Sequence, residues 1–194
     1  VASSGFAAYC AVLEGVRDRL RAVRENRPVP KKLPNTTIEF RQDAYLDSGY
    51  IANQEQKMEI YRRLAAIEDE KTLTDLIDEV IDRFGTPSQP AEKLFRISEI
   101  RVKARHLGIG SIIDEGDSLL VTWADESFMH GWDPMKLPKT WLPYLKFLPG
   151  SPAKLRIHKA LIKGTMTDWM ADCMDELKSE TMIMTGSVSL TSFT

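Results

Sequence analysis

The clearest hydrophobic pattern in the chain lies between residues 72 and 84, where apolar side chains recur every three or four positions. That spacing places them on one face of an α-helix. Thr72 followed by Asp75 predicts a capping box at its start, and Gly85 followed by Pro87 predicts its end. The positions predicted to be buried are Leu73, Leu76, Ile77, Val80, Ile81 and Phe84.

Two more helices are predicted beside this one. Asn53 is a suitable N-cap for the earlier helix, which is predicted to run to about Ile67. Pro90 is predicted to open the later helix, because a proline in the first turn loses no hydrogen bond, and Gly108 to end it. The predicted buried faces are Met58, Tyr61, Leu64 and Ala65 in the earlier helix, and Leu94, Ile97, Ile100, Ala104 and Leu107 in the later one.

The remaining patterns are shorter. Residues 3–25 carry the apolar stripe of a long N-terminal helix, and residues 36–40 alternate as a strand does. Residues 111–123 predict a β-hairpin and residues 155–158 a short strand, whereas residues 124–150, rich in Trp and Pro, predict no element. Thr165 with Asp168 predicts the start of a last helix. Its predicted inward positions are Met166, Trp169, Met170, Cys173, Met174 and Leu177.

The order of these elements predicts an α+β fold: a long N-terminal helix, a strand, a three-helix cluster, then a hairpin and short strands with a C-terminal helix. Composition is typical of a globular protein, with 194 residues, 43% of them hydrophobic and 28% charged. A net charge of −2 argues against wholesale phosphate binding, and no apolar run is long enough to span a membrane. Cys10 and Cys173 are expected to be reduced core residues of a cytoplasmic protein. The lack of both a signal peptide and an initiator Met suggests a fragment or a processed product.

The sequence offers little catalytic chemistry. It has no phosphate-binding loop and no nucleophile elbow, and Gly108-Ile109-Gly110 is an incomplete dinucleotide motif in the wrong order of elements. The three histidines, His106, His130 and His158, do not have metal-ligand spacing. No catalytic, cofactor-binding or metal-binding residue is therefore predicted. An enzyme that uses His130 and nearby acids is kept as an alternative.

One face of the helix predicted over residues 72–84 carries four acidic residues. Asp75, Asp78, Glu79 and Asp82 recur at i, i+3, i+4 and i+7, with Arg83 beside them. Like charges at this spacing weaken a helix slightly. The periodicity alone favours a solvated face; the alternative is a docking surface for a basic partner.

Basic side chains form two similar groups. They are Arg17, Arg21 and Arg24 in the first helix, and Arg96, Arg101, Lys103 and Arg105 in the third helix of the cluster. Aromatic residues for base stacking are not interleaved with them, and acids balance their charge. An ordinary solvated surface is favoured, and a stand-alone nucleic-acid-binding module is kept as an alternative.

The segment Ile60-Tyr61-Arg62-Arg63-Leu64-Ala65, followed by Asp82-Arg83-Phe84-Gly85 at the end of Leu76–Gly85, resembles the C-terminal (TRCF) domain of bacterial transcription-repair coupling factors. The opening Gly5-Phe6 with Tyr9-Cys10 resembles the end of the motor region in that family, and Ala104 to Ile109 fits as well. The resemblance is strong from Gly5 to Ile109, weak from Gly110 to Glu180, and absent from Thr181 to Thr194.

The resemblance implies a division into residues 1–30, a helical lead-in from a motor region, residues 31–181, a regulatory domain, and residues 182–194, a tail of unknown role. It implies a non-catalytic domain without cofactors that packs on the UvrA-binding module of the same protein and restrains an ATP-dependent DNA translocase. UvrA, RNA polymerase and DNA are implied partners of the full-length protein in nucleotide-excision repair. Matched residue by residue, the implied docking residues are Glu79 and Asp82, with Arg83 in the same motif.

Overall fold

The computed structural model describes residues 33–125, 137–148 and 150–185, and the elements below belong to one compact unit that begins at Pro34. The predicted N-terminal helix, with Cys10, lies outside the described residues, as do His130 and residues 186–194. The helices are α2 (Gln54–Ala66), α3 (Glu70–Phe84), α4 (Gln89–His106) and α5 (Met166–Thr185). The strands are β1 (Thr37–Glu39), β2 (Ile109–Asp114), β3 (Ser118–Trp123), β4 (Leu145–Leu148) and β5 (Lys154–His158).

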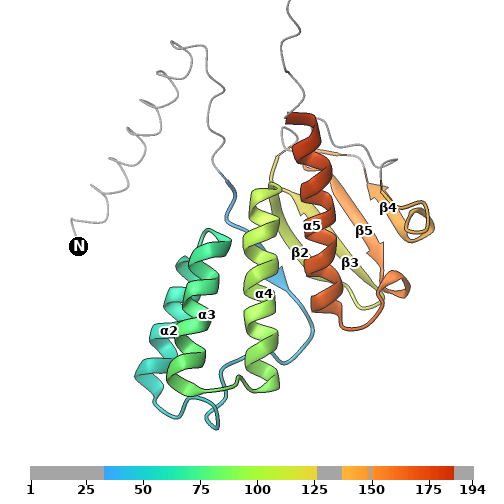
Figure 1. The fold of residues 1–194 in the computed structure, drawn as a ribbon. Coiled ribbons are helices and arrows are strands. Elements are labelled where there is room, and N and C mark those ends of the chain that lie inside the picture. Colours follow the sequence, from blue (N-terminus) through green and yellow to red (C-terminus); the bar gives the residue numbers. More distant parts are fainter. Residues whose placement is uncertain (1–32, 126–136, 149, 186–194) are drawn as a thin grey trace, which may run out of the picture. The chain divides into compact units, whose positions relative to one another are not determined.

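The strands form a five-stranded sheet in the order β1-β2-β3-β5-β4. β1 pairs in parallel with β2, and the other neighbours are antiparallel. Helices α4 and α5 lie against one face of this sheet (Figure 1). The predicted α+β class, the three-helix cluster, the hairpin and the last helix are confirmed.

The described residues contain two hydrophobic cores. The first lies between the sheet and helices α4 and α5, and the second lies among α2, α3 and α4. Helix α4 contributes side chains to both cores. Ile100 and Ala104 face the sheet, while Phe95 and Val102 face the other two helices. Its predicted single stripe is therefore incomplete, and Leu94, Ile97 and Leu107 are only half-buried. A helix packed on two sides loses the one-sided periodicity on which the prediction relied.

The buried face of α2 differs from the predicted one. Lys57, Ile60 and Leu64 are buried, whereas Met58 is 46% exposed. Ala65 is also exposed, and Tyr61 is half-buried with its hydroxyl accepting a hydrogen bond from the Leu46 backbone N–H at 2.8 Å. The prediction was wrong because a long lysine stem, like that of Lys57, can line a core while its amine reaches a polar group.

Helix α3 begins two residues before the predicted cap. Asp69, in extended conformation, accepts a hydrogen bond from the Thr72 backbone N–H at 2.8 Å, so it is the N-cap. The predicted capping box of Thr72 and Asp75 is wrong, because Thr72 already lies within the helix. Asp75 instead pairs with Lys71 at 2.7 Å.

The predicted stripe of α3 is only partly buried. Leu73, Leu76 and Val80 are buried, Ile77 and Phe84 are half-buried, and Ile81 is exposed. The helix packs against α2 and α4 through a narrower face than the apolar stripe. Ile77, Ile81 and Phe84 are therefore left at its edge.

The segment without predicted elements contains more structure than the sequence indicated. The single turn Leu142–Tyr144 leads into the edge strand β4. At the start of α5, the Thr165 hydroxyl oxygen accepts from the Asp168 backbone N–H at 3.2 Å, as the predicted cap requires. Cys173 is buried with a free thiol, and burial raises its pKa to about 12. Among the described residues, no helix is long and apolar enough to cross a membrane.

Candidate docking site on helix α3

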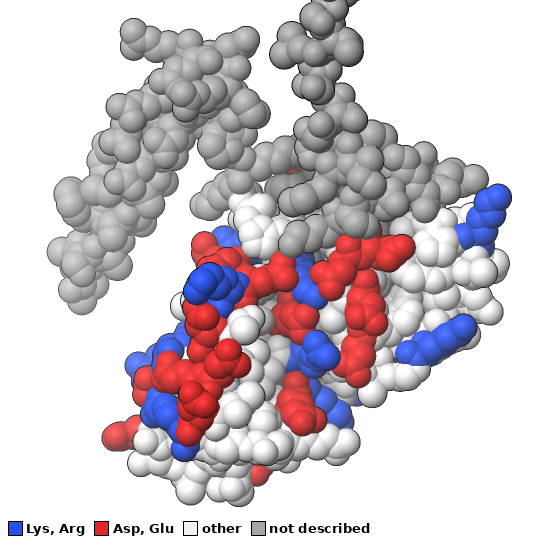
Figure 2. Space-filling model, viewed as in Figure 1, with Lys and Arg blue, Asp and Glu red and all other residues white. Residues whose placement is uncertain are grey.

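The acidic face of α3 points away from the second core. Asp75, Asp78 and Asp82 are exposed, and Glu79 is half-buried. Figure 2 shows acidic side chains gathered over this helix and again along α5, with basic side chains between them. The four acids therefore share a face, as their spacing predicted, but their surroundings differ.

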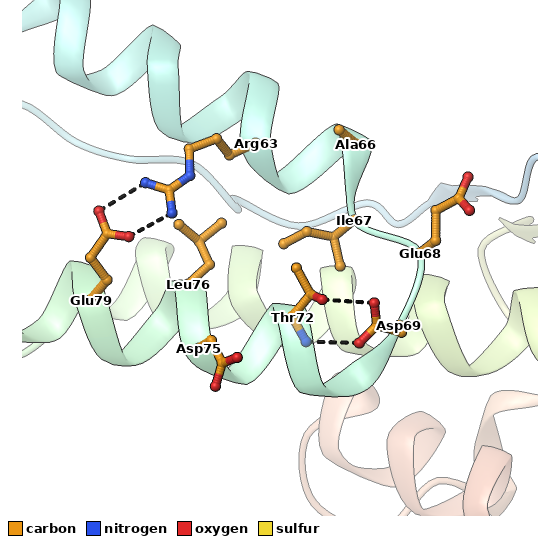
Figure 3. A pocket seen from close by; sticks show the side chains of 9 residues that line it. All are labelled: Arg63, Ala66, Ile67, Glu68, Asp69, Thr72, Asp75, Leu76 and Glu79. Carbon is orange, nitrogen blue, oxygen red and sulfur yellow. Dashed lines mark hydrogen bonds and ion pairs between the residues drawn. The ribbon is translucent and has the colours of Figure 1, made fainter.

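Glu79 is held by two arginines. Its Oε1 and Oε2 accept hydrogen bonds from the two terminal nitrogens of Arg63 at 2.8 and 2.5 Å (Figure 3). Arg83 donates to Oε1 at 2.9 Å. A bidentate arginine–carboxylate pair of this kind is a strong ion pair with a fixed orientation. The hydrogen bonds from Arg63 and then Arg83 lower the pKa of Glu79 to about 2. Glu79 is thus ionised at neutral pH, and both of its oxygens are occupied.

Arg63 connects helix α2 to helix α3 at one end of a pocket. The pocket runs from this ion pair, past Leu76, to the Asp69 cap of α3 (Figure 3). Its lining contains the acids Glu68, Asp69, Asp75 and Glu79 and one base, Arg63, and it holds no histidine, cysteine or lysine. The lining thus offers no histidine or cysteine for acid–base or nucleophilic chemistry near pH 7, and its one hydroxyl, on Thr72, donates to the Asp69 carboxylate at 2.7 Å. In the described part of the chain, no group of three potential metal ligands was found.

Asp82 and Arg83 lie one turn further along α3. Asp82 is exposed and makes no hydrogen bond or ion pair with the described residues, and the same holds for Asp78. Arg83 is shared between Glu79 and the ring of Phe84, whose centroid is 5.0 Å from the guanidinium carbon. Phe84 in turn contacts the ring of Tyr50. This motif therefore combines one unpaired carboxylate with an arginine that neighbouring side chains already position.

The three predicted docking residues thus differ in how far their charges are already paired. Asp82 can accept a cationic partner directly, whereas Glu79 can do so only by exchanging or sharing Arg63 or Arg83. Arg63 was not among the predicted site residues. The signal was available, because Arg63 belongs to the quoted Tyr61-to-Ala65 motif, but its partner is 16 residues away.

The basic residues of α4 are largely engaged within the domain. Arg96 pairs with Glu99 and Asp168, Lys103 with Glu99 and Asp175, and Arg105 with Glu68. One terminal nitrogen of Arg101 donates to the backbone carbonyls of Leu64 and Ile67 at 2.7 and 3.0 Å. Cations committed in this way are poorly placed to neutralise phosphates. The described surface therefore gives no support to the nucleic-acid-binding alternative.

Two of the three histidines have local structural contacts. His106 Nε2 lies 3.2 Å from the Glu68 carbonyl, and His158 Nδ1 accepts from the Ala160 backbone N–H. Neither lines one of the pockets described here. His130, the candidate of the enzyme alternative, lies outside the described residues.

Comparisons with known proteins agree with this architecture. Residues 40–131 match the family model of the TRCF domain. The chain is 37% identical over 120 residues to a transcription-repair-coupling factor of Staphylococcus haemolyticus, and 38% identical over 119 residues to one of Staphylococcus epidermidis. These matches cover 62% and 61% of this chain but only 10% of each relative, so the chain spans about a tenth of their length.

A solved structure supports the fold. The crystal structure of the C-terminal domain of a transcription-repair coupling factor superposes with a TM-score of 0.66 at 18% identity, covering 79% of this chain and 98% of that one. The helical cluster packed on a mixed sheet therefore defines a TRCF-type α+β domain. The sequence matches point to the same family: residues 40–131 match the TRCF domain, and the chain is similar to transcription-repair-coupling factors over about three fifths of its length.

Proposed function

We propose that this domain is a non-catalytic regulatory element of a transcription-repair coupling factor. It packs on the UvrA-binding module of the same protein and restrains the DNA translocase until RNA polymerase is engaged. The contact is made by the acidic face of α3, with Asp82 at its centre. The observation that carries this proposal is the exposed and unpaired carboxylate of Asp82, set beside an arginine–glutamate cluster that is already ordered.

The chemistry of the face supports this docking role. An arginine on the partner can pair with Asp82 without breaking an existing ion pair, so its desolvation is offset by a new charge-assisted hydrogen bond. Glu79 contributes a second contact when a partner arginine takes the place of Arg63 or Arg83. Charge complementarity of this kind selects the partner and speeds its encounter.

The test is a charge reversal in the full-length protein. Asp82→Lys should weaken the closed state, since close interfacial charge pairs couple by about 1.5 kcal/mol or more. Linkage then requires that UvrA, which competes for the same module, gains apparent affinity, by about tenfold for that energy. Titration of labelled UvrA measures this gain, and the basal ATPase rate should rise in parallel.

Asp75→Lys is the matched control, because Asp75 lies on the same helix and is also exposed but pairs with Lys71. It should leave both the UvrA affinity and the ATPase rate unchanged. An unchanged UvrA affinity in the Asp82→Lys protein, or an equal gain in the control, would overturn the proposed contact.

A further inference from the structure

The carboxylate of Glu79 is nearly filled by arginines of the domain itself. A carboxylate offers about four positions to hydrogen-bond donors, roughly two on each oxygen. Arg63 takes one position on Oε1 and one on Oε2, and Arg83 takes the second position on Oε1. A cation of the partner therefore finds one open position, on Oε2, and it finds that position beside a guanidinium group.

The charges around Glu79 also balance. Glu59, one turn before Arg63 on α2, has a carboxylate oxygen 3.7 Å from the Arg63 guanidinium. Together with Glu79 and Arg83, these side chains bring two carboxylates and two guanidinium groups to one place. The acids of α3 follow a regular spacing, but at Glu79 their negative charge is cancelled. The attraction for a basic partner is therefore concentrated at Asp82.

Arg63 is the more exchangeable of the two arginines. It reaches from α2 across to Glu79 (Figure 3), its side chain is 39% exposed, and Glu59 on its own helix is a second acceptor within reach. Arg83, by contrast, lies on the same helix as Glu79 and packs over the ring of Phe84. Exposed ion pairs add little to stability, so Arg63 can leave Glu79 while the domain stays folded. An arginine of the partner presents the same planar fork to the same carboxylate.

We propose that Arg63 is a built-in competitor for the arginine that the partner presents to Glu79. While Arg63 holds Glu79, the partner is bound through Asp82. When a partner arginine takes that place, Arg63 turns to Glu59 and the second contact forms. This competition keeps the affinity of the closed state below what the acidic face could reach, so the contact can be released. The inference rests on the proposed function, because it takes the UvrA-binding module as the partner.

The experiment measures binding of the 194-residue chain, added in trans, to the purified UvrA-binding module of its parent protein by isothermal titration calorimetry. Arg63→Met should tighten binding about two- to fivefold, the range that an exposed ion pair is worth, because the partner no longer has to displace Arg63. In a chain that already carries Glu79→Gln, the same substitution should leave the affinity unchanged, since the carboxylate for which the two arginines compete is gone. Thermal unfolding of each variant shows that the domain is still folded.

Arg62→Met is the matched control, because Arg62 is the exposed neighbour on α2 and its Nε donates to the Met58 carbonyl of the same helix. It removes the same charge without freeing Glu79, so it should bind as the original chain does. If Arg63→Met does not tighten binding, or does so no more than Arg62→Met or equally in the Glu79→Gln chain, this inference fails. The proposed function still stands in that case if Asp82→Lys weakens binding. If the original chain does not bind the module, the proposed function fails, and the inference fails with it.

Discussion

The neighbouring residues Val80 and Ile81 allow a sharp test of how α3 packs. Both belong to the same apolar stripe in the sequence, but Val80 is 0% exposed and Ile81 is 38% exposed. Val80 is enclosed by the second core, where Ile60 is also completely buried. Truncating each side chain to alanine therefore removes a different amount of packing.

The magnitude follows from the atoms removed. Val80→Ala deletes two fully buried methyl groups, worth about 1.6 kcal/mol in transfer free energy, and leaves a cavity that raises the total to about 2–3 kcal/mol. Ile81→Ala deletes more atoms, but many of them already contact water, so the expected loss is below about 1 kcal/mol. Alanine is also a better helix former than either residue by a few tenths of a kcal/mol, which offsets both losses equally.

Urea denaturation followed by circular dichroism measures this difference. We expect the midpoint of Val80→Ala to fall clearly below that of Ile81→Ala, with the same slope for both because the surface exposed on unfolding hardly changes. An equal loss of stability in the two variants, or a greater loss in Ile81→Ala, would mean that α3 packs in a different rotation about its axis.

Two further predictions concern contacts that hold the elements together. Arg101→Ala should lower the free energy of unfolding by about 1–3 kcal/mol in a urea titration, because the Ile67 carbonyl at the end of α2 loses its side-chain donor. The Leu64 carbonyl keeps only the bond from the Ile67 backbone N–H at 3.3 Å. An unchanged free energy of unfolding would refute this role of Arg101. Burial alone would raise the pKa of Asp114, but hydrogen bonds from Lys159 and from backbone N–H groups outweigh it and hold that pKa below its ordinary value. Since the folded-state pKa is depressed, Asp114 stabilises the fold above the unfolded-state pKa, and that stability is lost as the pH falls through the folded value. Asp114→Asn should therefore flatten the acid side of a plot of unfolding midpoint against pH, and an unchanged acid slope would contradict this.

The sequence predicted elements better than it predicted their faces. Cap signals such as Asn53, Pro90 and Gly108 are local, so the helices could be located from them. The side chains that are buried depend on what the element packs against. Lys57 and Ile81 show this in opposite directions, because the lysine is buried and the isoleucine is exposed.

For the candidate site, the sequence likewise predicted which residues share a face but not which of them are paired. Periodicity placed four acids on one face, and the family motif marked Glu79, Asp82 and Arg83. Neither could indicate that Glu79 is already bound by Arg63, because that pair joins two helices and depends on how they pack. The sequence also could not indicate that Gln42 and Thr167, which are distant in the chain, line one pocket with Ile81 of α3.

The parallel pairing of β1 with β2 has a consequence for how the chain folds. The Thr36 hydroxyl donates to the Ile109 carbonyl across 73 residues, and all of α2, α3 and α4 lie between them. Closing a flexible loop of that length costs about 4 kcal/mol in chain entropy beyond a constant. Helices whose contacts are close in sequence form early, and their packing brings the two ends of the loop together before the strands meet. Packing of the three-helix cluster thus brings β1 and β2 together. A substitution that weakens the core of this cluster should therefore slow the pairing of β1 with β2 as well as destabilise the cluster.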